Sequence, residues 1–427
     1  MYRAPSPSTQ PEHPARAPSP STQPEHPARA PSPVRKSMSV PTRRRLSRRG
    51  RRELLALAAA VPILVAVTAC STSPAPTPEP SSDPITIAVE AALTGDLSAN
   101  GQDILRGAQL AVDQANESGG VLGRQIVIIE ADDKADPATG IALAQEIVDG
   151  PAVAVVGIDD SSVGLKNLPL YINGEVVPVH MTSSDDTAGE GVTIRPKNSQ
   201  ISPVEVAYIK GLNATNVSML VDPSAYTQGM ADRLSKALNA DGITVTMTPI
   251  VAGKVDYTEE VTAALSSGPN VVYVSTYYPE GSVIANALAV AAAGGSTAAC
   301  FMGLGNQDPG FISAAGIPDS QGCVFSGVPT PDEFPAAADF ISAYTAKFST
   351  APGVWSVFAY DSVRLLLNAM TSANSTDYAP VLEALTNSTD FAGATGPITI
   401  VPATGIRPNA PVTILKVTSA GAFALAS

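Results

Sequence analysis

Histidine, cysteine and basic side chains are scarce in this chain of 427 residues. Only one of its three histidines, His180, follows Cys70, and no H-E-x-x-H, G-x-S-x-G or P-loop motif occurs. A lone histidine after an apolar strand is more often structural than a general base. The adjacent acids Asp132-Asp133 and Asp185-Asp186 are expected to be solvated loop charges. We therefore do not expect an enzyme, and a hydrolase would need a nucleophile and a base in contact.

Basic residues are rarest in the part of the chain after Cys70. Twelve of the 26 Lys and Arg but only three of the 39 Asp and Glu precede it, which leaves fourteen basic and thirty-six acidic residues, a net charge of −22. Such an acidic surface argues against nucleic acid as a partner, because phosphates need basic side chains. It suits a solvated extracytoplasmic domain. About 345 ordered residues are too many for one ordinary core, so two lobes are expected.

Cysteine occurs three times. If Cys70 is set aside, Cys300 and Cys323 remain, and both flank predicted strands at 298–302 and 324–327. A disulfide between neighbouring strands is the favoured interpretation in an oxidising compartment, and two buried thiols are the alternative. No Cys/His spacing indicates a metal site, and no cofactor is expected.

The uncharged apolar run from Leu54 to Cys70 is shorter than the roughly 20 residues of a membrane-spanning helix. It follows a cluster of arginines and ends in Val67-Thr68-Ala69-Cys70. We predict a lipoprotein signal peptide over 38–69, with Cys70 lipidated and the protein anchored on the outer face of the cell membrane. A transmembrane anchor, or a secretory signal ending at a buried cysteine, is the alternative.

Two segments lack apolar periodicity. Residues 1–37 carry a proline-rich unit, Arg3 to Ala15, that is repeated from Arg16 to Ala28. We infer no fold there and expect translation to start at Met38. Residues 70–84 are rich in Ser, Thr, Pro and Glu and are expected to form a flexible tether.

From Ile85 onward, β-branched runs alternate with helical patterns. Asp136 is expected to cap a helix that Pro137 opens and that runs to Val148. Strands are predicted at 85–89, 125–130, 153–156, 176–179, 217–221, 243–248, 271–275, 298–302, 324–327, 398–401 and 412–417. Late helices are predicted at 334–348, 355–370 and 378–385. This alternation predicts an α/β fold with two doubly wound parallel-sheet lobes and a ligand cleft between them.

Several motifs in order carry a family resemblance: Leu93-Thr94-Gly95, Gly119-Gly120-Val121-Leu122-Gly123-Arg124, Asp132 to Pro137, and Thr276-Tyr277-Tyr278-Pro279-Glu280. From about 85 to 417, the chain resembles the type I periplasmic binding proteins of ABC transporters, in the leucine/isoleucine/valine-binding branch. The resemblance implies a three-crossover hinge near Ile201, Pro329 and Ala392. Lobe 1 would comprise 85–201 and 330–392, and lobe 2 would comprise 202–329 and 393–427.

The resemblance also implies a ligand site between the lobes. Ser161, Thr182 and Ser184 match positions that bind the carboxylate of an amino acid, and Tyr226 and Tyr277 match two cleft tyrosines. Ser161 could instead be a plain helix N-cap, and the pair Thr182 and Ser184 a simple turn. An aromatic at a strand end is, in general, more often part of a core.

Two departures leave the ligand open. Asn100 stands where the family packs an aromatic residue against the ligand, and Gly305 stands where the family has the acid that binds the ligand ammonium. Glu280 or Asp308 should then supply the charge, because a buried ammonium without a carboxylate is costly. If neither does, the ligand would be an amide, a urea-like molecule or a carboxylate.

The resemblance implies an extracytoplasmic, monomeric substrate-binding protein of an ABC importer. It would capture a small polar ligand, expected to be a branched-chain or related amino acid, by hinge closure and present it to the permease subunits. A ligand-sensing receptor lipoprotein with the same site is the alternative.

Overall fold

The computed structural model describes residues 83–426, which belong to one compact unit. The predicted repeat, the signal peptide, Cys70 and most of the tether fall outside the described residues. Across 83–426, no helix combines the length and the apolar character needed to cross a membrane.

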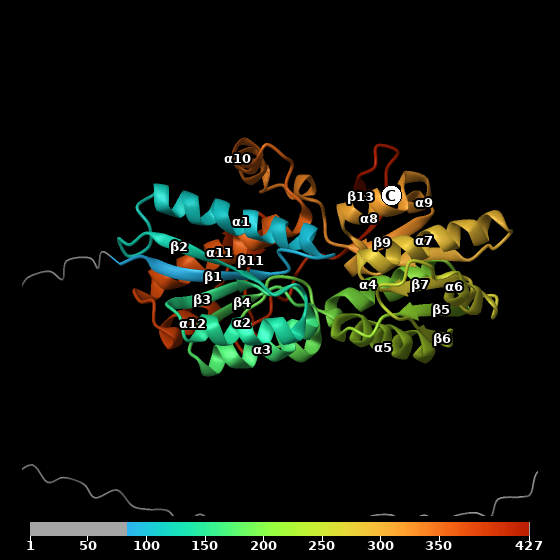
Figure 1. Ribbon diagram of the computed structural model, residues 1–427, viewed down its shortest axis with the longest axis horizontal. Coiled ribbons are helices and arrows are strands. Elements are labelled where there is room, and N and C mark those ends of the chain that lie inside the picture. The colour runs from blue at the N-terminus through green and yellow to red at the C-terminus, as the bar shows by residue number, and fades with distance from the viewer. Residues whose placement is uncertain (1–82, 427) are drawn as a thin grey trace, which may run out of the picture. The chain divides into compact units, whose positions relative to one another are not determined.

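The first lobe is built on a four-stranded parallel sheet in the order β2-β1-β3-β4. Its strands are β1 (Ile85–Ala91), β2 (Ile126–Asp132), β3 (Ala152–Gly157) and β4 (Val177–His180). Helices α1 (Ser98–Glu117) and α11 (Val354–Ala373) lie over one face, and α2 (Pro137–Val148) and α3 (Ser161–Asn173) over the other (Figure 1). Helices α10 (Ala338–Phe348) and α12 (Tyr378–Thr386) complete this lobe. The sheet is thus buried on both faces, which explains its continuous apolar strands.

Local signals position the helices of this lobe. The Asp136 carboxylate accepts a hydrogen bond from the Thr139 amide at 2.8 Å, and Pro137 is the first residue of α2, so the predicted cap and start are confirmed. Helices α1 and α11 meet at Gly107, where an added Cβ would lie 2.1 Å from the carbonyl oxygen of Ser356. Glycine therefore allows the two backbones to touch.

The second lobe contains a seven-stranded sheet in the order β13-β12-β9-β8-β7-β5-β6. The strands are β5 (Asn216–Val221), β6 (Thr244–Pro249), β7 (Val271–Ser275), β8 (Ala299–Met302), β9 (Cys323–Gly327), β12 (Thr413–Val417) and β13 (Phe423–Leu425). The helices are α4 (Asn198–Gly211), α5 (Ala225–Ala240), α6 (Thr258–Leu265), α7 (Tyr278–Ala293), α8 (Pro309–Ala315) and α9 (Ile317–Gln321). Strands β5 to β9 are parallel, whereas β12 and β13 are antiparallel additions at one edge.

Two of the three cysteines join neighbouring strands. Cys300 and Cys323 are direct partners in the β8–β9 ladder and form a disulfide. The predicted pairing is therefore present, and two free buried thiols are not.

The chain passes three times between the lobes, but the last passage is later than Ala392. The hairpin of β10 (Phe391–Gly393) and β11 (Gly396–Ile398) packs on α11, where the buried Asp361 carboxylate accepts hydrogen bonds from the Ala394 and Thr395 amides at 2.8 Å each. Ile406 still bridges Thr193 of the first lobe. Residues 393–407 thus lie with the first lobe, because their backbone satisfies its buried acid.

Candidate ligand cleft

The carboxyl ends of strands from both sheets face each other. The Tyr277 hydroxyl, after β7, donates to Asp160 Oδ2, after β3, at 3.0 Å. The Ala225 amide at the start of α5 donates to Ser162 Oγ at 3.1 Å. Tyr278 adds a hydrogen bond to the carbonyl of Asp96. These contacts join residues 63 to 182 positions apart, so they exist only while the lobes are together.

A hollow of about 530 Å³ lies beside these contacts and is lined from both lobes. Its polar lining includes Asp96, Lys134, Asp160, Asp222, Tyr277 and Glu280. Burial raises the pKa of Asp160 to about 6. Four carboxylates against one ammonium make this part of the cleft a poor place for an anion and a good one for a cation.

Ser161 is buried at the first position of α3, and its Oγ accepts a hydrogen bond from the Ser184 amide at 3.2 Å. The helix cap is Asp160, whose Oδ1 accepts from the Ser162 and Val163 amides at 2.8 and 2.9 Å. The plain N-cap role therefore belongs to Asp160. Ser161 still has a hydroxyl hydrogen to donate.

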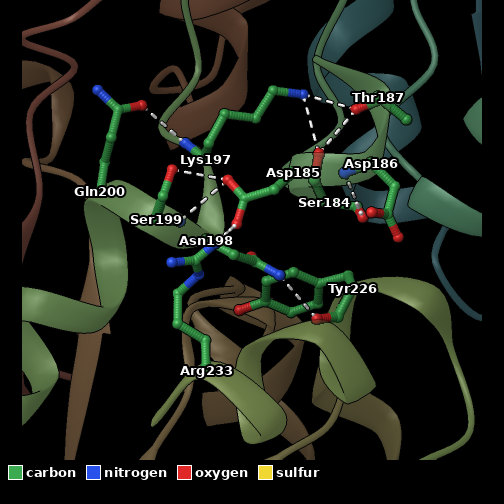
Figure 2. Close-up of polar contacts among 10 residues, drawn as sticks. All are labelled: Ser184, Asp185, Asp186, Thr187, Lys197, Asn198, Ser199, Gln200, Tyr226 and Arg233. Atoms are coloured by element: carbon green, nitrogen blue, oxygen red, sulfur yellow. Dashed lines mark hydrogen bonds and ion pairs between the residues drawn. The ribbon is translucent and has the colours of Figure 1, made fainter. Parts of the chain in front are cut away.

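The loop after β4 is held by Lys197, which the sequence reasoning did not single out. Figure 2 shows its ammonium group close to Thr187, to which it donates at 2.6 Å, and to the Ser184 carbonyl, to which it donates at 3.2 Å; it also donates to the Thr182 carbonyl at 3.0 Å. Lys197 is fully buried, and burial lowers its pKa to about 7. No motif in the sequence distinguishes this lysine, because its burial depends on segments that meet only in the fold.

The side chains of this loop are already engaged. Thr182 Oγ1 lies 2.8 Å from His180 Nδ1 and 2.6 Å from Thr187 Oγ1. Burial and the Lys197 charge hold the pKa of His180 well below its usual value, so the imidazole is neutral. His180 is thus structural, as expected, and Thr182 has its backbone amide rather than its hydroxyl to offer a ligand.

The two predicted cleft tyrosines pack on each other, with ring centroids 5.8 Å apart. The Tyr226 hydroxyl accepts a hydrogen bond from the Gly305 amide at 3.2 Å. A Cβ at Gly305 would lie 2.6 Å from the Thr276 carbonyl oxygen, so no acidic side chain fits there. Tyr277 thus lines the 530 Å³ hollow and packs on the buried Tyr226, and the backbone at Gly305 leaves no space for a larger side chain.

The other three sequence candidates lie apart. Glu280 borders the 530 Å³ hollow and accepts from the Gly253 amide at 2.9 Å. Asp308 caps α8 and is fully buried, with its Oδ2 unpartnered among the described residues; burial raises its pKa to about 6. Asn100 lines a separate hollow of about 280 Å³ with Asp103 and Pro309. The structure does not bring Asn100 into the hollow beside Glu280.

Two further charged residues near the cleft, Asp159 and Arg195, were not predicted from the sequence. The Arg195 guanidinium carbon lies 3.7 Å from the centroid of the Trp355 ring. Burial raises the pKa of Asp159, and the Arg195 charge counteracts that rise. The available signal was position, because Asp159 directly follows an apolar strand whose carboxyl end faces the cleft.

Comparison with known proteins agrees with this architecture. The family described as "Periplasmic binding protein" matches residues 84–422. Leu/Ile/Val-binding protein homolog 3 of Brucella melitensis is 31% identical over 323 residues, 74% of this chain and 86% of its own. Leu/Ile/Val-binding protein BraC3 of Rhizobium johnstonii is also 31% identical, over 74% of this chain and 87% of its own length. The isoleucine complex of the substrate-binding protein LivJ of Streptococcus pneumoniae superposes with a TM-score of 0.69 at 25% identity, covering 81% of this chain and 99% of LivJ. This chain belongs to the periplasmic binding protein family.

Proposed function

We propose that this protein is the lipid-anchored, extracytoplasmic substrate-binding component of an ABC importer for an amino acid, branched-chain or closely related. The names of its relatives favour such a ligand. The observation that carries the proposal is the meeting of polar strand-end residues of both lobes, above all the hydrogen bond from Tyr277 to Asp160. Each lobe contributes one partner, as capture by closure requires.

Closure is the mechanism of capture. The bonds of Tyr277 to Asp160 and of Ala225 to Ser162 break when the lobes separate. A ligand that contacts both lobes binds the closed form more tightly, and this difference in affinity drives the equilibrium towards closure. A permease can then distinguish loaded from empty protein by its closed shape.

The carboxylate of the ligand would bind at the start of α3. Ser161 offers its hydroxyl, and the Thr182 amide belongs to a loop that Lys197 fixes from behind. A hydroxyl and a backbone amide can each donate one hydrogen bond to a carboxylate oxygen. Tyr226 and Tyr277 would cover the ligand from the second lobe.

Cys70 would attach the protein to the membrane, and residues 70–84 would let the two lobes reach the permease subunits. A sensor lipoprotein would have the same anchor and the same cleft. Uptake of the bound ligand in a strain lacking this chain distinguishes the two: loss of uptake supports the importer, and normal uptake opposes it.

Binding itself is tested with the protein from Ser71 onward and a panel of the twenty amino acids, short amides and urea. We expect at least one amino acid to raise the melting temperature. Ser161→Ala should weaken its binding by about 10- to 150-fold, because a hydrogen bond to a charged group contributes about 1.5–3 kcal/mol. Ser388→Ala, at the end of α12, is the matched control and should bind normally. If no amino acid shifts the melting temperature, the assignment fails.

A further inference from the structure

The Arg195 side chain is a buried cation without a hydrogen-bond partner. It is 6% exposed, and its Nε and Nη1 atoms have no partner among the described residues. The guanidinium stacks on Trp355, which fixes its plane but satisfies none of its N–H groups. Native proteins rarely leave such donors unpaired, so a missing acceptor is indicated.

Arg195 lies where both lobes meet. It belongs to the segment between β4 and α4, which carries the chain from the first lobe to the second. Trp355, on which it stacks, lies in the first turn of α11 of the first lobe. Tyr226 and Tyr277 of the second lobe are close enough for their charges to affect the pKa of Arg195. The unpartnered donors are therefore close to residues of both lobes.

Asp159 is the residue whose charge most raises the pKa of Arg195, yet the two side chains do not form an ion pair. Among the described residues, no ion pair joins the Asp159 carboxylate to the Arg195 guanidinium within 4.0 Å. Asp159 adjoins Asp160, which accepts the hydrogen bond of Tyr277 from the second lobe, and its charge also affects the pKa of Tyr277 and of Asp308 in that lobe. Two opposite charges thus influence each other without forming an ion pair.

Asp159 is better placed to bind a ligand than the two acids expected from the sequence. The carboxylate of Asp308 is fully buried and caps α8, so a ligand cannot reach it without moving that helix. One carboxylate oxygen of Glu280 already accepts a hydrogen bond from the Gly253 amide. Asp159 is only partly buried, and it follows β3 directly, two residues before Ser161.

We propose that Arg195 binds the carboxylate of the ligand and that Asp159 binds its ammonium group, so that the cleft selects a zwitterionic amino acid. This inference rests on the proposed function. A carboxylate has two oxygens with about four lone-pair sites, so Ser161 and Arg195 can share it. A simple amide or urea carries neither charge and would leave the buried Arg195 and the partly buried Asp159 without charged partners, which disfavours those ligands.

Calorimetric titration with four probes tests the assignment: L-leucine, leucinamide, 4-methyl-2-oxopentanoate, which lacks the ammonium, and isopentylamine, which lacks the carboxylate. If another amino acid binds more tightly in the panel, it and its own three analogues replace them. We expect wild-type protein to bind the amino acid at least tenfold more tightly than each analogue. Binding of the amide as tight as that of the amino acid overturns the proposal.

Charge-neutral variants assign the residues. Asp159→Asn should weaken leucine binding at least tenfold and change 4-methyl-2-oxopentanoate binding less than threefold. Arg195→Gln should weaken the binding of leucine and of 4-methyl-2-oxopentanoate at least tenfold and leave the binding of isopentylamine unchanged. Glu280→Gln and Asp308→Asn test the two competing acids, and both variants should bind leucine within threefold of wild type if Asp159 holds the ammonium group. Arg195→Lys, which keeps the charge, should recover part of the affinity if Arg195→Gln melts early.

The failures can be told apart. If leucine binds wild-type protein but only Glu280→Gln or Asp308→Asn weakens it, the assignment to Asp159 is wrong and the proposed function stands. If Arg195→Gln folds and binds leucine normally, the assignment to Arg195 is wrong. If no amino acid binds wild-type protein, the proposed function fails and this inference fails with it.

Discussion

Replacement of Tyr277 by phenylalanine removes one hydroxyl that bridges the two lobes. In the structure this hydroxyl donates to Asp160 Oδ2 at 3.0 Å, while Oδ1 of the same carboxylate caps α3. The change leaves the aromatic ring and its packing on Tyr226 in place. It should therefore affect closure rather than the fold of either lobe.

The size of the effect follows from the charge of the acceptor. A hydrogen bond to a charged group contributes about 1.5–3 kcal/mol net, and 1.4 kcal/mol is a factor of ten in an equilibrium constant. If closed protein binds the ligand, Tyr277→Phe should weaken apparent affinity by about 10- to 150-fold. Because the pKa of Asp160 is raised to about 6, the bond is charge-assisted at pH 8 and neutral at pH 5. The penalty should be smaller at pH 5, where a neutral bond contributes about 0.5–1.5 kcal/mol.

The assay is calorimetric titration of both proteins at pH 8 and pH 5, with small-angle scattering of the ligand-free forms to detect opening. Tyr273→Phe is the matched control, because its hydroxyl donates to Glu205 at 3.0 Å within the second lobe. It should lower the melting temperature and leave affinity unchanged. Wild-type affinity in Tyr277→Phe at pH 8 would refute the reasoning, as would an equal loss in Tyr273→Phe.

Three further predictions concern stability. Burial, the main cause, raises the pKa of Asp133 to about 8. Between about pH 4 and pH 8 the folded protein therefore keeps a proton that the unfolded chain releases, and the free energy of unfolding in urea should fall as the pH rises through this window. The same dependence of unfolding free energy on pH in Asp133→Asn would contradict this. Cys300→Ser/Cys323→Ser should cost about 3 kcal/mol in urea unfolding for a 23-residue separation, and an unchanged midpoint would show that the bridge adds nothing. Gly107→Ala should lower the free energy of unfolding by about 1–3 kcal/mol in thermal melting, because its Cβ would meet the α11 backbone at 2.1 Å. Gly211→Ala is the control and should be neutral, because an added Cβ there has no atom within 4 Å. Equal losses of stability in the two variants would refute the packing argument.

Much of the fold was predictable because its signals are local. The apolar period of each strand and helix depends on residues a few positions apart. The start of α2 depends only on Asp136, Pro137 and Thr139, which are close together in the sequence. The disulfide followed from two cysteines that flank adjacent predicted strands. Ordered family motifs predicted the family, and the positions of the ligand-binding residues stay a prediction. Where residues 393–407 pack could not be read in this way, because that depends on Asp361, a buried acid more than 30 positions away.

The sequence by itself determined a two-lobed α/β chain with polar residues at the strand ends and an acidic surface, since periodicity and charge are properties of the chain alone. Only the tertiary structure decided which charges are buried and which remain without partners. Asp159, Arg195 and Lys197 acquire perturbed pKa values only when distant segments enclose them. Desolvation depends on every atom that surrounds a group, so it is set by packing and not by neighbours along the chain.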